Sequence, residues 1–140
     1  MASQLKVDTI TGVTTAGSIA VTGEGNSTTT NLQQGVCKAG VQFDGTATDA
    51  AARDSHNVGS MTDHSTGTYS VNFTNNMAND DYAFAMAANQ TSTGTGMVTG
   101  DNAHQTVVAV GSLKFSFTGS SSNSVTDTII GSAMIIGDLA

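Results

Sequence analysis

The chain has 140 residues and a formal net charge of −7, with 4 Lys and Arg against 11 Asp and Glu. This length suits one domain of ordinary size and leaves little room for two separate hydrophobic cores. Four scattered cations cannot form the basic stripe that neutralises phosphates, so the composition excludes nucleic acid as the main partner. The sequence lacks the run of about 20 apolar residues that spans a membrane and the basic, apolar start of a signal peptide, so we expect no membrane insertion.

The polarity of the chain comes from uncharged groups, with 22 Thr, 15 Ser, 16 Gly, 10 Asn and 6 Gln. Such a composition favours strands and turns over helices, because Thr is β-branched while Asn and Gly supply turns. Leu, Ile, Val and Phe together are only 27 residues, and the chain has no Trp. A core this poor in large apolar groups is marginal in a single copy, so we expect burial between copies in a homo-oligomer, with a trimer as the expected state.

Residues 1–35 form a distinct N-terminal segment. Leu5–Ile10 alternates apolar and polar side chains, which predicts a short strand, and Gly17–Gly23 does so again between two glycines. The segment has too few apolar residues to fold alone, so we expect an extended arm used for attachment or subunit exchange. The residues expected to make the attachment are its large apolar ones: Leu5, Val7, Ile10, Ile19 and Val21.

Residues 36–140 alternate more strongly and predict a knob domain. Roughly six to eight short strands separated by polar turns predict an all-β fold, either an antiparallel β-sandwich or an open barrel, jelly-roll-like in arrangement. Helix is expected only as single turns at Ala50–Asp54 and Asn76–Asn79. The predicted strands are Val41–Phe43, Tyr69–Phe73, Tyr82–Ala87, Val107–Val110, Leu113–Phe117, and Ile129–Ile130 with Met134–Ile136. The expected core consists of Phe43, Tyr69, Val71, Phe73, Phe84, Leu113, Phe115, Phe117 and Ile135.

The residue patterns that carry enzyme chemistry are missing, so we expect no catalytic activity and no cofactor. There is no Gly-x-Ser-x-Gly or His-Glu-x-x-His motif. In Asp54-Ser55-His56 the serine and histidine are adjacent, so on an extended backbone their side chains diverge. The three histidines show no His-x-His repeat, so each is expected on the surface unless copies bring them together at a symmetry axis: His56, His64 and His104.

Two further groups have a structural interpretation. Asp80-Asp81 offers carboxylates without the spaced ligand set of a calcium loop, so a solvated turn is favoured and no metal site is expected. Cys37, the single cysteine, cannot form an intrachain disulfide, which suits synthesis in a reducing cytosol.

The segment from Gly67 to Ala83 carries a recognisable pattern. A Tyr-x-Val-x-Phe strand at Tyr69–Phe73 runs into a turn with Met77 and Asn79, and then into a strand that opens with Tyr82-Ala83. Upstream are Val41-Gln42-Phe43 and the Arg53–Val58 segment, and the chain ends in Gly-Asp-Leu-Ala. Over nearly its whole length the chain resembles small β domains in virion proteins of tailed bacteriophages, especially marine cyanophage tail fibres. Two positions depart from that pattern, with Gly40 where Trp is common and His56 where an aromatic is common, which removes apolar area from a core or a subunit contact.

The resemblance implies a structural protein on the virion surface, which would contact other virion proteins. The placement favoured by length is a capsid decoration protein that grips the shell with residues 1–35. The alternative is a short tail fibre that contacts a host surface glycan, with Thr95, Asn102 and His104 as candidate contacts. An alternative of another class, a carbohydrate-binding module, requires exposed aromatic side chains, of which a chain with two Tyr and no Trp offers few.

Overall fold

The computed structural model describes residues 5–11, 19–22, 29–89, 97–99, 106–119, 124–137 and 139. Its contacts divide the chain into two compact units, Met1–Val36 and Cys37–Ala140. The boundary lies one residue beyond the one expected between arm and knob.

The N-terminal unit contains a small antiparallel ribbon. Strand β1, Ala20–Thr22, pairs with β2, Thr29–Asn31, and a four-residue helix, α1, Leu32–Gly35, follows directly. The Leu32 N–H donates a hydrogen bond of 2.8 Å to the Ile19 carbonyl. The strand expected at Leu5–Ile10 is wrong, because residues 5–11 belong to no strand. Alternation alone does not make a strand when no neighbouring backbone pairs with its N–H and C=O groups.

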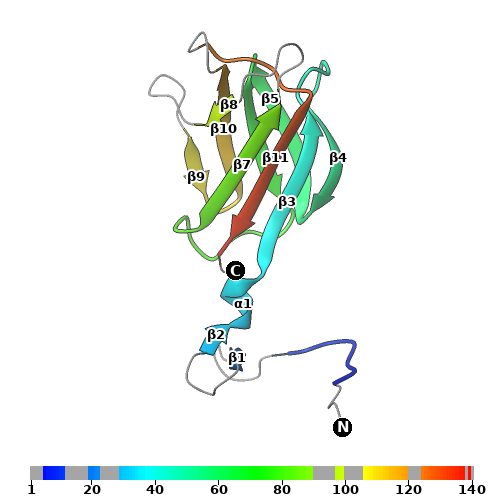
Figure 1. Ribbon diagram of the computed structural model, residues 1–140, viewed down its shortest axis with the longest axis vertical. Helices are drawn as coiled ribbons and strands as arrows, with labels where there is room; N and C mark the ends of the chain where they lie inside the picture. Colours follow the sequence, from blue (N-terminus) through cyan, green and yellow to red (C-terminus); the bar gives the residue numbers. More distant parts are fainter. Residues whose placement is uncertain are drawn as a thin grey trace. The chain divides into compact units, whose positions relative to one another are not determined.

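The second unit contains a four-stranded antiparallel sheet in the order β4-β3-β11-β7 (Figure 1). Its strands are β4, Ala51–His56; β3, Cys37–Asp44; β11, Ile130–Ile136; and β7, Ala83–Asn89. The helical turn expected at Ala50–Asp54 is wrong, because β4 occupies this segment and pairs with β3. The helical turn at Asn76–Asn79 is also wrong, since Met77 is fully buried and forms an isolated bridge with Leu139.

A second antiparallel sheet has the order β5-β6-β10-β8, and β9 pairs with the opposite end of β10. Its strands are β5, Val58–Ser65; β6, Thr68–Phe73; β8, Met97–Thr99; β9, Val107–Ala109; and β10, Ser112–Gly119. The two sheets pack face to face, which confirms the predicted antiparallel β-sandwich. Of the two predicted forms, the sandwich is therefore the one observed, and not the open barrel.

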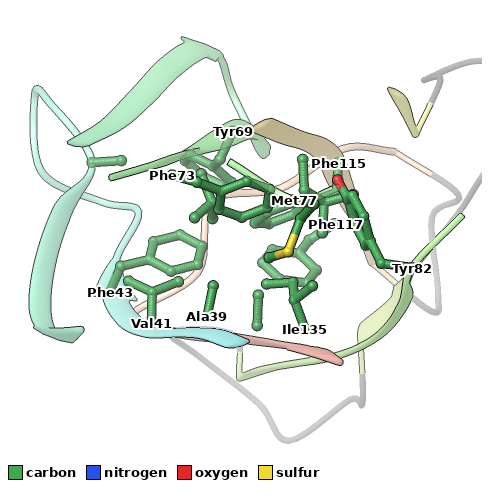
Figure 2. Close-up of a cluster of buried hydrophobic side chains, with 14 residues drawn as sticks. Ala39, Val41, Phe43, Tyr69, Phe73, Met77, Tyr82, Phe115, Phe117 and Ile135 are labelled. Atoms are coloured by element: carbon green, nitrogen blue, oxygen red, sulfur yellow. The ribbon is translucent and has the colours of Figure 1, made fainter. Parts of the chain in front are cut away.

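The core lies between the sheets, where alternate side chains of β3 and β11 meet those of β6 and β10 (Figure 2). Four aromatic rings form its centre. Phe43 lies 5.0 Å from Tyr69, 6.1 Å from Phe115 and 6.2 Å from Phe117 between ring centroids. The residues expected in the core that are buried are Phe43, Tyr69, Val71, Phe73, Leu113, Phe115, Phe117 and Ile135.

Phe84 is the exception, and its expected place in the core is wrong. It pairs with the buried Ile135 and so lies on the inward row of β7, yet it is 37% exposed. The reason is that β7 is an edge strand, which has a strand neighbour on one side only. Alternation predicts the face of a side chain but not its distance from the edge of the sheet.

Asn57 forms the corner where the chain leaves β4 and enters β5 in the other sheet. Its φ of 54° is left-handed, a conformation that asparagine tolerates better than most residues. The Asn57 Oδ1 accepts hydrogen bonds from Asn75 N (2.8 Å) and Nδ2 (3.1 Å), while Asn57 Nδ2 donates to the Asn75 carbonyl (3.1 Å). The side chain therefore ties the corner to the segment that follows β6.

We expect Asn57→Ala to lower the free energy of unfolding by about 1.5 to 2.5 kcal/mol, because it adds left-handed strain and removes these hydrogen bonds. Asn57→Gly is the matched control, since it relieves the strain and removes only the hydrogen bonds. Urea denaturation of both variants separates the two contributions. Equal losses in both would show that the left-handed backbone adds no cost.

Candidate interaction surface

The outer face of the four-stranded sheet is built by the residues that alternate with the core positions. On β7 these are Ala83, Ala85 and Ala87, and all three are exposed. Across the ladder from Ala83 lies Ile136, and across from Ala85 lies Met134. At these two levels a small side chain lies beside a larger one, whereas Ala87 lies across from Ser132, which is also small.

The larger row is unusually exposed for apolar side chains. Ile130 is 40% exposed, Met134 45% and Ile136 36%. On the other side of Met134 the register places Gly40, where an added Cβ would have no neighbour closer than 3.8 Å. Together Ala83, Ala85, Ala87, Ile130, Met134 and Ile136 form a mainly apolar patch, here called the β7–β11 face, in which Ser132 lies between Ile130 and Met134. Exposed apolar side chains that gather in this way can mark interaction sites.

A shallow groove of about 350 Å³ lies beside this face, over β3 and β4. It is lined by Gly40, Val41, Gln42, Asp54, Ser55 and His56. The register pairs Gln42 with Asp54 and Gly40 with His56, so these polar side chains border the apolar face on the same side of the sheet. Gly40 and His56 are therefore neighbours on the outer surface of the sheet and not in the core.

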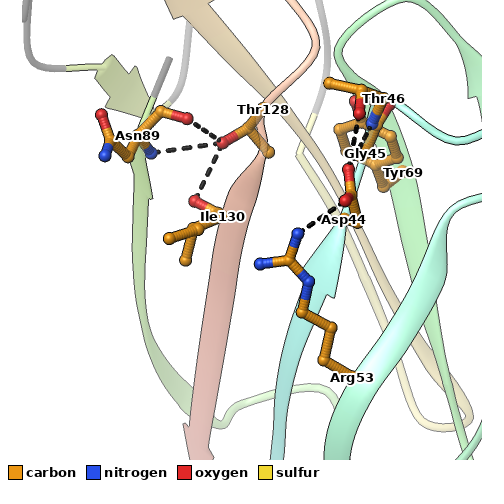
Figure 3. Close-up of polar contacts among 8 residues, drawn as sticks. All are labelled: Asp44, Gly45, Thr46, Arg53, Tyr69, Asn89, Thr128 and Ile130. Atoms are coloured by element: carbon orange, nitrogen blue, oxygen red, sulfur yellow. Dashed lines mark hydrogen bonds and ion pairs between the residues drawn. The ribbon is translucent and has the colours of Figure 1, made fainter. Parts of the chain in front are cut away.

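An ion pair joins β4 to the end of β3 (Figure 3). Arg53 donates a hydrogen bond of 2.6 Å to Asp44, and both side chains are partly exposed. Asp44 also accepts from the hydroxyl and the backbone N–H of Thr46, at 2.7 and 3.0 Å. Hydrogen bonds from Thr46, and then from Arg53, lower the pKa of Asp44. The Asp44 carboxylate therefore already accepts hydrogen bonds from Thr46 and Arg53 within the chain.

The outer face of the second sheet is chemically different. Many of its side chains are hydroxyls and amides that bond to one another: Asn72 donates to Ser60 at 3.1 Å and to Thr62 at 3.0 Å. The hydroxyls of Thr68 and Ser116 lie 3.1 Å apart. Lys114 lies on the same outward row of β10, and the Thr118 hydroxyl is buried with no hydrogen-bond partner. The β7–β11 part of the first sheet is thus mainly apolar, whereas the outer row of the second sheet is mainly polar.

His64 and Ser70 meet on this polar face, a pair that the sequence analysis missed. The His64 Nε2 lies 2.8 Å from the Ser70 Oγ, across the β5–β6 hairpin. This is the geometry of a base beside a nucleophile, but Ser70 is 7% exposed. Among the described residues no carboxylate is hydrogen-bonded to the other ring nitrogen, so the third member of a triad is not assembled there. In the sequence, the only sign of this contact was that His64 and Ser70 are six residues apart around a turn. The register of the β5–β6 hairpin is irregular there, so the spacing alone did not predict which side chains meet.

A second pair that the sequence analysis missed is buried. The Tyr69 hydroxyl lies 2.9 Å from Asp127 Oδ1 and 3.1 Å from the Gly45 carbonyl oxygen. Because it has a single proton, it donates to only one of these two acceptors at a time. Asp127 also accepts from Gly67 N–H at 2.6 Å. Burial, and then the neighbouring Asp127, raise the pKa of Tyr69. The tyrosine thus stays neutral and holds three loops together.

Thr128, the residue after Asp127, connects β7 and β11 in a similar way (Figure 3). It is fully buried and accepts a hydrogen bond of 3.2 Å from Asn89 N–H. Its hydroxyl lies 2.7 Å from the Asn89 carbonyl and 2.9 Å from the Ile130 carbonyl, either of which can take its proton. These contacts fasten the end of β7 to the start of β11 and so fix the β7–β11 face.

The remaining candidate residues are dispersed. Ser55 pairs with the inward-facing Val41 while His56 pairs with Gly40 on the outer face, so the two side chains diverge as expected. Asp81 N–H donates to Asn79 Oδ1 at 2.9 Å in an exposed turn. The Cys37 thiol is partly buried and donates to the Ala39 carbonyl at 3.1 Å. The candidate glycan contacts Thr95, Asn102 and His104 lie outside the described residues.

In the N-terminal unit the residues expected to make the attachment are largely accessible. Leu5, Val7, Ile10 and Val21 are each more than half exposed, and Ile19 is partly buried. In the described part of the chain, no group of three or more His, Cys, Asp and Glu side chains is placed to hold a metal ion. No described helix is long and apolar enough to cross a membrane.

Comparison with protein-family models gives no match, and comparison with curated proteins and with solved structures gives none either. The function is therefore argued from the fold and the surfaces above.

Proposed function

We propose that the protein is a structural protein of a tailed bacteriophage virion, a capsid decoration protein that grips the shell with its N-terminal unit and self-associates as a homo-oligomer. It is not an enzyme in this proposal, and it works on the virion surface after synthesis in the bacterial cytoplasm. Its partners are further copies of itself and the major capsid protein.

The observation that carries the proposal is the set of exposed apolar side chains in the N-terminal unit. Leu5 is 80% exposed, Val7 53% and Ile10 56%. Burying each such side chain contributes about 1.5 to 3 kcal/mol. Three of them within six residues therefore supply enough free energy to hold a segment on a partner surface, while the β-sandwich forms a separate unit.

The surface chemistry of the β-sandwich supports the same role. The outer row of its second sheet carries mostly hydroxyl and amide side chains, with Lys114 as the charged residue of β10, so salt screens few charges there. The aromatic platform on which a carbohydrate-binding module depends is absent from its faces. All five Phe and both Tyr lie in the described residues, and six of these seven rings are buried, Phe84 being the exception.

The triple variant Leu5→Ser, Val7→Ser, Ile10→Ser is expected to bind capsids of the same virus at least about 100-fold more weakly, since about 3 kcal/mol or more of apolar burial is lost. Co-sedimentation of the purified full chain with capsids measures this. The matched control is Lys6→Ser, Asp8→Ser, Thr9→Ser, which changes as many residues in the same segment to the same side chain and should bind within about threefold of the original.

Equal binding by the apolar and the polar triple variants would refute attachment through the N-terminal unit. Immunogold labelling of intact virions tests the placement on the particle. Label over the shell supports decoration, label on the tail favours the short tail fibre, and no label on any virion contradicts the proposal as a whole.

A further inference from the structure

We infer that the β7–β11 face is a self-association surface, and that its occupant is the same face of a second copy, related by a two-fold axis parallel to the strands. The inference rests on the homo-oligomer of the proposed function. It names a two-fold pair in place of the trimer expected from composition.

The size pattern of the face points to this partner. Ala83, Ala85 and Ala87 form a low row, and the neighbouring row on β11 carries the large side chains of Met134 and Ile136. A surface with a low row beside a high row is complementary to a copy of itself when the copy sets its high row over the low one. Isologous interfaces need this self-complementarity.

The geometry of a sheet selects one of the possible two-fold axes. An axis parallel to the strands, above the boundary between β7 and β11, places each copy's β7 over the partner's β11. Ala85 of one copy then lies over Met134 of the other, because the two residues are paired at the same level in each sheet. An axis across the strands would instead stack Met134 near Met134 and alanine near alanine, which leaves a clash beside a gap.

Charge favours the same arrangement. Each copy has a net charge of −7, so pairing through most surfaces would bring like charges together. Neither β7 nor β11 contains a charged residue. Asp54 and His56 lie on β4, two strands away from β11, and the rotation carries the β4 strands of the two copies to opposite sides of the pair.

The area of the face sets the expected strength. Seven residues at about 3.4 Å each and two strands about 4.8 Å apart cover about 230 Å² per copy, or roughly 460 Å² for the pair. Stable complexes bury about 1,200 Å² or more. The face alone therefore predicts a weak, concentration-dependent dimer, which becomes populated where copies are crowded together, as on the surface of a particle.

Sedimentation velocity of the full chain from about 10 µM to about 1 mM tests the inference in the range expected for a weak interface. The mass should rise from that of the 14.1 kDa chain toward twice that value. Met134→Glu places a charge in the centre of the face and should weaken association at least about tenfold. Val107→Glu is the matched control, because Val107 is 44% exposed, close to the 45% of Met134, but lies on β9 in the other sheet.

A size-exchange cycle distinguishes this packing from general stickiness. Ala85→Met raises apolar area but sets a large side chain against Met134, so it should weaken association roughly five- to tenfold; Met134→Ala leaves a gap and should also weaken it. The double variant restores one small and one large partner, and should recover association to within about threefold of the original protein. Thermal unfolding of each variant verifies that the outward-facing substitutions leave the sandwich folded.

Each outcome separates this inference from the proposed function. Stronger association of Ala85→Met, or equal weakening by Met134→Glu and Val107→Glu, would overturn the two-fold face while leaving the homo-oligomer intact. A chain that stays monomeric at the highest concentration would overturn self-association itself, and the capsid-binding result for the N-terminal unit would still stand or fall separately. A stable mass of three chains that Met134→Glu does not change would restore the trimer.

Discussion

Replacing Phe43 by alanine is expected to lower the free energy of unfolding by about 3 to 5 kcal/mol. Phe43 is fully buried, and its ring contacts those of Tyr69, Phe115 and Phe117, so the cavity would open at the centre of the core (Figure 2). Domains of this size are stable by only about 5 to 15 kcal/mol. The variant should therefore unfold at a much lower urea concentration, measured by circular dichroism.

Phe84→Ala is the internal control for this prediction. It removes the same ring from the one aromatic position that is substantially exposed, so the loss should be smaller, about 1 to 2 kcal/mol, because only part of the side chain is withdrawn from water. A Phe43→Ala loss under about 1 kcal/mol would contradict the burial pattern. So would a loss for Phe84→Ala that exceeds the loss for Phe43→Ala.

Gly67→Ala is expected to destabilise the protein by about 2 to 4 kcal/mol, from left-handed strain and from displaced backbone. Gly67 has a φ of +67°, and an added Cβ would lie 2.5 Å from the Thr126 nitrogen and 2.7 Å from its carbonyl oxygen. These are backbone atoms, which cannot move aside as a side chain can. Gly67 also donates to Asp127 at 2.6 Å and accepts from Phe117 N–H at 2.8 Å, so a shift would disturb the Tyr69 network as well.

Two companion variants identify the cause. Gly67→Asn tolerates the left-handed conformation but keeps the collision, so it should remain clearly destabilised. Gly40→Ala adds a methyl group on the open outer face and should change stability by less than about 0.5 kcal/mol. Thermal and urea unfolding give both values. A Gly67→Ala protein as stable as the original would show that the loop near Thr126 yields without cost.

The strands and most of the core could be predicted because they depend on local alternation. Tyr69, Val71 and Phe73 alternate with polar residues on β6, and that period places them on one face wherever the strand lies. The same logic failed at β4. Every residue of Ala51–His56 is exposed, so burial leaves no periodic signal there, and only the backbone pairing with β3 makes the segment a strand.

The candidate surfaces depended on contacts that local pattern does not contain. Tyr69 and Asp127 are 58 residues apart, and their hydrogen bond exists because the loop before β11 returns to the start of β6. The β7–β11 face likewise joins Ala85 to Met134 from distant parts of the chain. From β7 alone, three exposed alanines are unremarkable edge residues, and they become part of a surface only beside Met134 and Ile136.

The sequence by itself determined that the chain is a β protein rich in hydroxyl side chains, with few charged residues and few aromatic ones, because composition and a two-residue period act on each strand separately. Only the tertiary structure decided which strands are neighbours. That choice depends on how both sheets bury Phe43 and its partner rings at once, and it is this long-range packing that leaves Phe84 at an edge and sets small side chains beside large ones on an outer face.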